Sequence, residues 1–360
     1  MTHRSRKTQA IINLSALKNN YNQIASLAPQ SKTIAVIKAN AYGHGAIEIA
    51  KSLNSLVPAF AVAFIDEAIV LRNAGITLPI LILEGPLDKE DFTLATQHDF
   101  WLMLHNNEQI SWLTQHPNYK EKLWLKIDTG MNRLGFTPKH AKKILAKLTN
   151  EQKKHLVICS HFSSADELDN PKTPAQIVCL KTLSEKYSCQ LSLSNSAGII
   201  NWPQSHADFN RLGLALYGAN PTPIKNMPMK LTPAMTLQST IIALRKLKLG
   251  DSVGYGEAWR AKQASVIATI AIGYADGYPR NSPAGTPVFI NNQLAPLAGR
   301  VSMDMITVDV TNIANVSVGD VVELWGENLS VEVVAEHMNT INYELLTRVS
   351  ARVPKVYINK

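Results

Sequence analysis

Two kinds of segment alternate through the first two thirds of the chain. Runs rich in β-branched and other aliphatic residues are separated by stretches whose apolar residues recur at helical spacing. The runs lie at residues 33–38, 58–64, 79–83, 100–104, 122–128, 155–161, 189–194 and 208–212. Clear helical spacing lies at residues 15–28, 46–53, 66–73, 138–149 and 174–187. Eight strands alternating with helices over roughly 200 residues predict an α/β fold of the (β/α)8, or TIM, barrel type.

A doubly wound open sheet is the alternative, because it shows the same alternation. Such a sheet often carries Gly-x-Gly-x-x-Gly after its first strand, and this pattern does not follow residues 33–38. The barrel is therefore the favoured architecture.

The pattern changes near Pro233. Helical spacing largely ends there, apart from residues 331–338, and a Pro-rich stretch at 221–233 is the natural linker. Strand-like runs follow at residues 235–246, 264–272, 287–290, 306–310, 320–325 and 352–358. We expect a barrel domain at residues 1–233 and a mostly β domain at residues 234–360, with which the first residues of the chain can associate.

The formal charge of +8 comes from one part of the chain. Residues 236–360 hold 11 basic and 11 acidic residues, so the whole excess lies within residues 1–235. The basic residues there are scattered, whereas a nucleic-acid binder more often shows a basic stripe with aromatic residues. The charge predicts a solvated surface rather than a nucleic-acid partner.

Other classes of protein are disfavoured by what the sequence lacks. No apolar run approaches the ~18 residues that cross a bilayer, and the basic N-terminal residues are not followed by an uninterrupted apolar segment of a secretion signal. Cys159, Cys179 and Cys189 cannot all pair and have no metal-binding spacing. We expect a cytoplasmic protein without a membrane segment and without a bound metal.

Barrel enzymes work from the carboxyl ends of their strands, and several polar residues fall there. Lys38 closes the first predicted strand, where a desolvated amine can act as a nucleophile. Ser196 and Gly213 follow the seventh and eighth strands, a recurrent place for phosphate in barrels. A nucleophilic lysine beside a phosphate site indicates pyridoxal phosphate or a phosphorylated aldol substrate. His161 ends the sixth strand, where a structural role is equally compatible with the pattern.

The segment Ala35–Gly45 closely resembles the cofactor-lysine motif of bacterial alanine racemases. The resemblance continues in the family's order along most of the chain. Its further blocks lie at residues 126–135, 161–166, 195–197, 211–218, 253–256, 272–277, 299–304 and 352–354. It implies a pyridoxal-phosphate-dependent isomerase of fold type III that interconverts L-alanine and D-alanine and supplies D-alanine for peptidoglycan.

The resemblance also implies roles for single residues. Lys38 would carry the cofactor, and Arg211 would meet its pyridine nitrogen. An arginine does not readily give up a proton, so the ring would remain a weak electron sink. The other residues implied at the cofactor are Tyr42, His161, Asn195, Ser196, Gly213 and Leu214.

The substrate carboxylate would be bound by Arg133 and by the backbone around Met303. Tyr274 and Asp304 match positions along the passage by which substrate reaches the site. Lys126 matches a position that some relatives carry as a carbamylated lysine supporting Arg133.

Inversion of a stereocentre needs proton transfer on opposite faces, which one base cannot easily serve. The resemblance implies Lys38 on one face and Tyr255 on the other, with Tyr255 and Met303 supplied by the second subunit of a homodimer. A tyrosine with its ordinary pKa of ~10 needs nearby positive charge to act as a base. His161, backed by Arg211, is the expected neighbour.

Some relatives carry a tyrosine directly before Arg352-Val353-Pro354 that reaches towards the cofactor phosphate. This chain has Ala351 there, so the resemblance implies one phosphate contact fewer.

Three other activities fit part of the pattern. A racemase of broader or different specificity, acting on serine or lysine, would share all these motifs. A fold type III amino-acid decarboxylase usually places an acidic residue where Arg211 stands. A pyridoxal-phosphate-binding carrier without turnover would lack the β domain and Tyr255.

Overall fold

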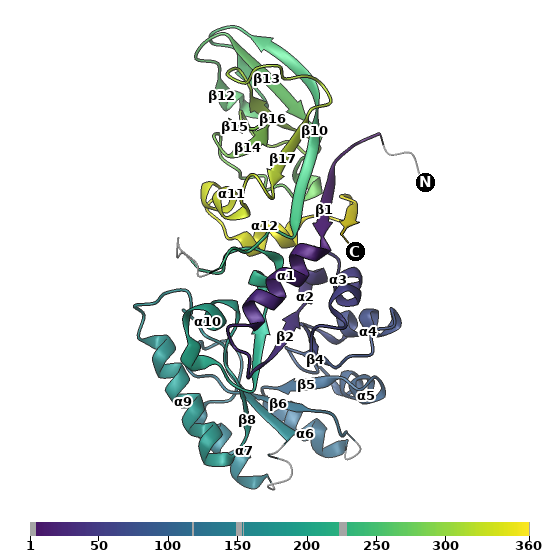
Figure 1. The fold of residues 1–360 in the computed structure, drawn as a ribbon, viewed down its shortest axis with the longest axis vertical. Coiled ribbons are helices and arrows are strands. Elements are labelled where there is room, and N and C mark those ends of the chain that lie inside the picture. The colour runs from purple at the N-terminus through teal and green to yellow at the C-terminus, as the bar shows by residue number, and fades with distance from the viewer. Residues whose placement is uncertain (1–4, 117–118, 149–152, 154, 223–228, 360) are drawn as a thin grey trace.

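The architecture was examined in a computed structural model, which describes residues 5–116, 119–148, 153, 155–222 and 229–359. Among these residues, eight parallel strands close into a barrel in chain order, from β2 to β9 and back to β2 (Figure 1). They are β2 (Lys32–Val36), β3 (Phe60–Val62), β4 (Ile80–Ile82), β5 (Trp101–Leu104), β6 (Leu123–Lys126), β7 (Leu156–Cys159), β8 (Gln190–Ser192) and β9 (Phe209–Leu212). The predicted barrel is therefore confirmed, and each strand lies within a predicted run or one residue from it.

Helices cover the outside of the barrel (Figure 1). They are α1 (Leu14–Ala25), α3 (Ala46–Leu53), α4 (Ile65–Asn73), α5 (Lys89–Gln97), α6 (Asn107–Gln115), α7 (Pro138–Lys147), α9 (Lys172–Tyr187) and α10 (Ser196–Asn201). Side-chain caps fix several starts: Asp88 accepts from the backbone N–H of Asp91 at 2.8 Å, and Asn106 from that of Gln109 at 2.9 Å. Inside the barrel, the rings of Trp124 and Phe209 pack with centroids 5.2 Å apart.

The second part of the chain is built around one long strand, β10 (Met235–Leu247), which also pairs with β13 (Ser265–Ile270). The sheet runs in the order β15 (Gln293–Pro296), β14 (Pro287–Ile290), β17 (Val321–Trp325), β10, β1 (Gln9–Asn13) and β18 (Lys355–Ile358). Strand β16 (Ile306–Asp309) pairs with β13, and β11 (Ser252–Val253) with β12 (Trp259–Arg260). The mostly β character of this region is confirmed. Residues 9–13 also belong to this sheet, because β1 lies between β10 and β18 (Figure 1). The boundary at residue 233 therefore stays a prediction.

Two helices of this region, α11 (Val331–His337) and α12 (Asn342–Arg348), lie on the side that faces the barrel (Figure 1). The side chain of Asn342 donates to the carbonyl of Asn220 at 2.9 Å. The hydroxyl of Tyr357 donates to the carbonyl of His44 at 3.1 Å. These contacts hold the second region over the carboxyl ends of the barrel strands, where barrel enzymes keep their active sites.

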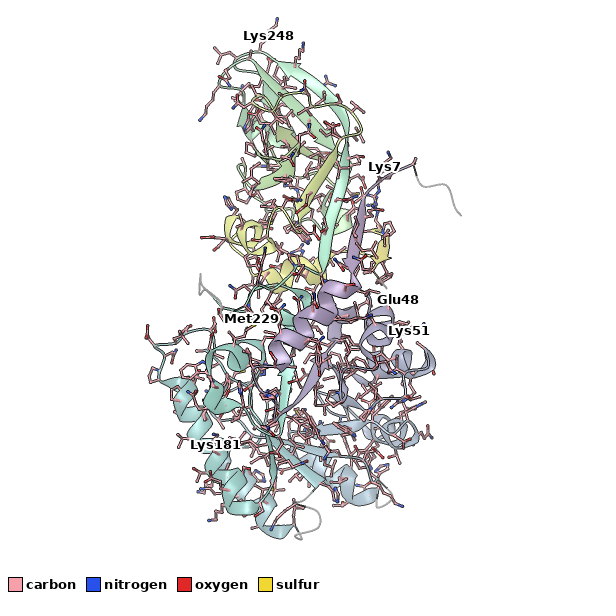
Figure 2. All side chains as sticks on the ribbon, in the orientation of Figure 1. Lys7, Glu48, Lys51, Lys181, Met229 and Lys248 are labelled. Carbon is pink, nitrogen blue, oxygen red and sulfur yellow. The ribbon has the colours of Figure 1, made fainter. Side chains whose placement is uncertain are left out.

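The lysines labelled in Figure 2 lie far apart, with Lys7 on the N-terminal segment, Lys181 on α9 and Lys248 at the tip of the β region. Among the described residues, no helix is long and apolar enough to cross a membrane. The predicted linker at 221–233 lies partly outside the described residues, which omit 223–228.

Candidate active site

A cavity of about 600 Å³ opens at the carboxyl ends of the barrel strands. Ten of the residues singled out from the sequence line it: Lys38, Tyr42, Lys126, Arg133, His161, Asn195, Ser196, Arg211, Gly213 and Leu214. Four of these side chains are Lys or Arg, whereas the acidic residues among those lining the cavity are Glu84 and Glu344. The excess of positive groups suits an anionic ligand.

Lys38 does not end a strand, as the sequence suggested, but begins the short turn α2 (Lys38–Tyr42). Four successive residues of this turn, from Ala39 to Tyr42, have φ between 50° and 54°. L-residues rarely form left-handed turns, which cost roughly 1–2 kcal/mol per residue. The turn places Lys38 at its start and Tyr42 at its end, both on the cavity wall.

Aromatic stacking supports the turn from behind. The ring of Tyr42 stacks on Tyr217 with centroids 4.8 Å apart, and Tyr217 packs against His44 at 4.5 Å. The Tyr217 hydroxyl donates to the carbonyl of Val36 at 2.9 Å, and Nδ1 of His44 lies 2.9 Å from the carbonyl of Tyr42. Burial raises the pKa of Tyr42 and lowers that of His44 to about 4.

Ser196 and Gly213 form a cradle of hydrogen-bonding groups. The Ser196 hydroxyl, 3% exposed by residue, accepts from the backbone N–H of Gly213 at 3.0 Å and from that of Ala215 at 3.3 Å. A Cβ at position 213 would lie 2.8 Å from the Tyr42 hydroxyl, so only glycine keeps this space open. Asn195 caps α10 by accepting from the backbone N–H of Gly198 at 2.9 Å.

Arg211 lies on β9, lines the cavity and is 5% exposed. Its guanidinium donates to Oγ of Ser192 at 2.5 Å and to the carbonyls of Ser160 and Leu193 at 2.7 and 3.1 Å. These three acceptors fix the plane of the guanidinium, so it presents a fixed charge to whatever occupies the cavity.

Burial lowers the pKa of His161 well below its ordinary value, and the charges of Arg211, Lys126, Arg133 and Lys38 lower it further. Burial and the surrounding cations therefore both favour the neutral imidazole. The role of His161 as a neighbour of the catalytic tyrosine stays a prediction, and the positive charges around it are those of Arg211, Lys126, Arg133 and Lys38. Burial also lowers the pKa of Lys126, at the end of β6.

Four predicted residues do not line this cavity: Tyr255, Tyr274, Met303 and Asp304. They lie in the β region, where the residues Tyr255 and Met303 are 67% and 53% exposed. The backbone N–H of Tyr274 donates to the carbonyl of Ser302 at 3.0 Å, which joins the loops carrying Tyr274 and Met303.

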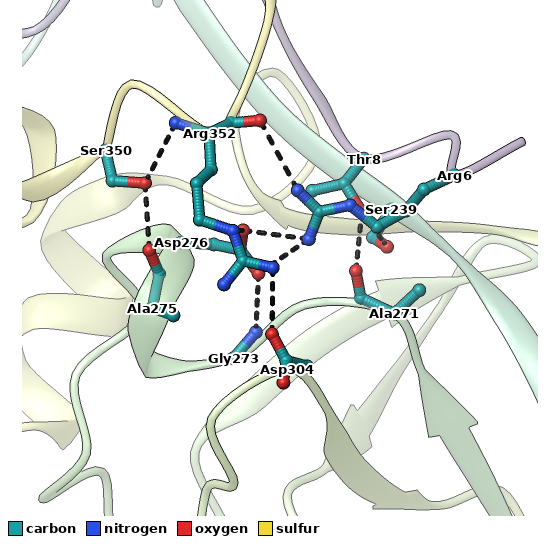
Figure 3. Close-up of polar contacts among 10 residues, drawn as sticks. All are labelled: Arg6, Thr8, Ser239, Ala271, Gly273, Ala275, Asp276, Asp304, Ser350 and Arg352. Carbon is teal, nitrogen blue, oxygen red and sulfur yellow. Dashed lines mark hydrogen bonds and ion pairs between the residues drawn. The ribbon is translucent and has the colours of Figure 1, made fainter. Parts of the chain in front are cut away.

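The turns that carry Tyr255 and Met303 also touch. A Cβ at Gly299 would lie 3.0 Å from the carbonyl of Val253, and one at Gly256 would lie 3.2 Å from the Arg300 guanidinium. Asp304 pairs with Arg352 at 2.8 Å (Figure 3). The four residues outside the cavity therefore belong to neighbouring loops of the β region.

Sequence reasoning missed the part of the cavity wall that the β region supplies. It consists of Ile341, Tyr343, Glu344 and Thr347, on and just before α12. The ring of Tyr343 lies 6.0 Å from that of Tyr42. Ala351 does not line the cavity, so the implied loss of one phosphate contact at that position stays a prediction. The search for polar residues at the carboxyl ends of barrel strands could not find this part of the wall, because α12 is not part of the barrel.

The cavity fits pyridoxal phosphate. Lys38 could supply an amine for the aldehyde, the cradle at Ser196 and Gly213 could supply hydroxyl and backbone N–H groups for the phosphate, and Arg211 could supply a fixed cation for the ring. Among the residues that the structure describes, no group of three or more His, Cys, Asp or Glu side chains could hold a metal ion.

Comparison with known proteins agrees with this geometry. Residues 12–221 match the family described as "Alanine racemase, N-terminal domain", and residues 234–357 match "Alanine racemase, C-terminal domain". An alanine racemase of Alteromonas mediterranea is 46% identical over 353 residues, covering 98% of this chain and 99% of that protein.

Solved structures are similar over the whole length. The biosynthetic alanine racemase of Pseudomonas aeruginosa is 41% identical with a TM-score of 0.92, covering 98% of this chain and 99% of that one. The alanine racemase of Bartonella henselae, whose structure holds covalently bound pyridoxal phosphate, is 32% identical with a TM-score of 0.90 and the same two coverages. The chain therefore belongs to the alanine racemase family of pyridoxal-phosphate-dependent isomerases, as its motifs predict.

Proposed function

We propose that this chain interconverts L-alanine and D-alanine with Lys38 and Tyr255 as the two bases. The observation that carries the proposal is the cavity itself. It combines the amine of Lys38, the cradle at Ser196 and the fixed guanidinium of Arg211. When bound, pyridoxal phosphate withdraws electrons from the Cα of an attached amino acid and so makes its proton acidic.

The residues of the chain decide what happens to that proton. Lys38 would hold the cofactor, and its amine would remove or return the Cα proton on one face. Arg211 is held by Ser192, Ser160 and Leu193 and keeps its charge, so it does not protonate the ring nitrogen. The fixed guanidinium would thereby favour return of the proton to Cα over transamination or decarboxylation, because a ring nitrogen that stays unprotonated withdraws electrons less strongly.

The remaining charges of the cavity bind and orient the substrate. Arg133 would hold the carboxylate, since a guanidinium matches a carboxylate with two parallel hydrogen bonds. Tyr42 and Ser196 would hold the phosphate, with the backbone N–H groups around Gly213 and Leu214. Carbamylation of Lys126 would replace a cation near Arg133 and Arg211 by an anion.

The second base comes from another copy of the chain. Tyr255 is 67% exposed and does not line the cavity of its own chain, and the same holds for Met303 at 53%. Large exposed apolar and aromatic side chains gathered on neighbouring loops are typical of an interface. In a two-fold dimer, the β region of each subunit would complete the other subunit's cavity with Tyr255 and the backbone of Met303.

The product D-alanine would serve peptidoglycan synthesis, and we place the reaction in the cytoplasm. Cys159, Cys179 and Cys189 are unpaired, in agreement with a reducing compartment.

The test is chiral analysis of the product formed from each enantiomer by the purified dimer with pyridoxal phosphate. Lys38→Ala is expected to lose inversion. Lys32→Ala, at the start of the barrel strand β2 that precedes the Lys38 turn, is the matched control and should keep it. A Lys38→Ala protein that inverts alanine as fast as the wild type would contradict the proposal.

A substrate panel separates alanine from the alternative substrates. We expect kcat/KM to be higher for alanine than for serine, lysine or arginine. Carbon dioxide release without inversion would instead identify a decarboxylase.

A further inference from the structure

The turn that carries Lys38 is strained and needs an outside support. Its residues from Ala39 to Tyr42 all have φ near 50°, whereas non-glycine residues normally visit this region singly. Such a conformation persists only when the surrounding structure determines it more strongly than local preference opposes it. The contacts that hold the turn therefore also set where the Lys38 amine and the Tyr42 hydroxyl stand.

One of these contacts comes from a carboxylate on the neighbouring helix. Oε1 of Glu67, in the first turn of α4, accepts from the backbone N–H of Ala39 at 2.6 Å. Oε2 of the same group accepts from the N–H of Ala63 at 2.8 Å, and from that of Phe64 at 3.4 Å. The two oxygens thus join the residue after Lys38 to the start of α4.

The chemistry of this bridge requires a carboxylate. Both oxygens face N–H donors, so both must accept. A glutamine has the same size but only one acceptor oxygen, and its NH2 group would face an N–H. Glu67 does not line the cavity, so it does not act on substrate directly.

We infer that Glu67 is a positioning residue for the Lys38 turn: its carboxylate fixes the turn from Lys38 to Tyr42 and thereby the affinity of the cavity for pyridoxal phosphate. The inference rests on the proposed function, because it assumes that Lys38 and Tyr42 hold this cofactor. It adds a residue outside the cavity on which the geometry of both groups depends.

The chain offers a matched control on the next helix. Asp91, in the first turn of α5, accepts from the backbone N–H of Leu87 at 2.8 Å and so supports a helix start in the same way. It is bonded to no residue of the Lys38 turn. Asp91→Asn therefore reports the cost of weakening a helix start, whereas Glu67→Gln also weakens the support of the turn, because one oxygen cannot accept on both sides of the bridge.

The experiment compares wild type, Glu67→Gln, Glu67→Asp and Asp91→Asn as full-length proteins. Pyridoxal phosphate is titrated into each, and binding is followed by the absorption change when the Lys38 amine condenses with the aldehyde. Hydrogen exchange of residues 38–43 is measured in the holoenzyme, and kcat and KM for alanine are measured separately.

We expect Glu67→Gln to bind pyridoxal phosphate roughly tenfold more weakly, since a hydrogen bond to a charged group is lost. Amide exchange at Ala39 should accelerate, and kcat should fall while KM for alanine changes little. Glu67→Asp keeps the carboxylate and should recover part of the affinity. Asp91→Asn should bind the cofactor like the wild type.

Two results would overturn the inference: cofactor affinity of Glu67→Gln within twofold of the wild type, or an equal loss in Asp91→Asn. Failure of the proposed function looks different, because the wild type itself would then neither take up pyridoxal phosphate nor invert alanine.

Discussion

One guanidinium nitrogen of Arg6 lies 2.8 Å from both carboxylate oxygens of Asp276, 270 residues further along the chain (Figure 3). Asp276 is 1% exposed and also accepts from the backbone N–H of Gly273 at 3.0 Å. Arg352 approaches the same carboxylate at 3.7 Å. The N-terminal segment, the C-terminal segment and the loop that carries Tyr274 therefore meet at one buried charge.

Replacing Arg6 by Gln should destabilise the protein. A buried carboxylate that loses a cation costs several kcal/mol, but Arg352 and Gly273 remain, so we expect a loss of about 1–3 kcal/mol in the free energy of unfolding. Urea denaturation at fixed protein concentration measures it.

Lys51→Gln is the control for this prediction, because Lys51 pairs with Glu48 at 3.9 Å on the surface of α3 (Figure 2). An exposed pair of this kind contributes about 0–1 kcal/mol. Equal losses in the free energy of unfolding would show that the Arg6–Asp276 pair stabilises the protein no more than an exposed ion pair.

Gly43→Ala should disturb the contact between the Lys38 turn and α12. A Cβ at this position would lie 2.2 Å from the carbonyl oxygen of Leu346. Gly250 is the control, since its φ of +91° is close to the +81° of Gly43 and nothing lies within 4 Å of its Cβ position. We expect Gly250→Ala to cost about 1 kcal/mol from backbone conformation alone, and Gly43→Ala to cost more and to weaken cofactor binding. Equal losses of stability would contradict this.

Acid should lower the free energy of unfolding, because His44 is fully buried and must take up a proton at low pH. Its folded-state pKa of about 4 lies below the ordinary value, first through burial. The unfolded chain therefore takes up the proton first, and the stability contributed by neutral His44 is lost as the pH falls from about 6.5 to about 4. We expect a loss of about 2 kcal/mol between pH 7 and pH 5 from this group.

The measurement is the free energy of unfolding at both pH values for wild type and for His44→Asn. The variant should be less stable at pH 7 but should lose less on acidification. His337→Asn removes an exposed imidazole and is the control. An unchanged pH dependence in His44→Asn would rule out His44 as the source.

Arg211→Lys should change which reaction follows proton removal. An ammonium gives up a proton more readily than a guanidinium and cannot make the same three hydrogen bonds to Ser192, Ser160 and Leu193. We expect racemisation to fall by one to two orders of magnitude, in line with loss of an oriented electrostatic group. The amount of pyruvate, the product of transamination, formed per molecule of alanine inverted should rise.

Arg133→Lys is the comparison for Arg211→Lys. It should raise KM for alanine without raising the share of pyruvate, because its predicted partner is the substrate carboxylate. If both variants form the same amount of pyruvate per molecule of alanine inverted, Arg211 does not control the choice between inversion and transamination.

The barrel could be predicted from the sequence because each strand is a short aliphatic run between helices. The segments that follow the strands then bring Lys38, His161 and Ser196 to one cavity with Arg211 of β9, although Lys38 begins a turn and does not end its strand. Strand β1 was harder, because Gln9–Asn13 belongs to a sheet whose other strands begin more than 200 residues later. Pairing over such a distance leaves no local pattern.

The left-handed turn and the wall from α12 could not be predicted. A run of positive φ at Ala39, Asn40 and Ala41 contradicts the local preference of these residues and follows from contacts such as that of Glu67. Helix α12 begins at Asn342 without a side-chain cap on Ile341, so its start carries no local signal. Tyr343 reaches the cavity only because the β region packs on the barrel.

In the proposed dimer, Lys38 and Tyr255 act in one site although they come from different subunits. Lys38→Ala and Tyr255→Phe chains carrying different affinity tags can be co-expressed and the heterodimer isolated. Each heterodimer would hold one site with both residues intact and one with neither. The assay is alanine inversion in the direction in which tyrosine removes the proton.

We predict that the heterodimer recovers about half of the wild-type rate, because one of its two sites is whole, while each parent homodimer stays strongly impaired. A heterodimer no more active than its parents would contradict the shared site and with it the assignment of Tyr255 as the second base.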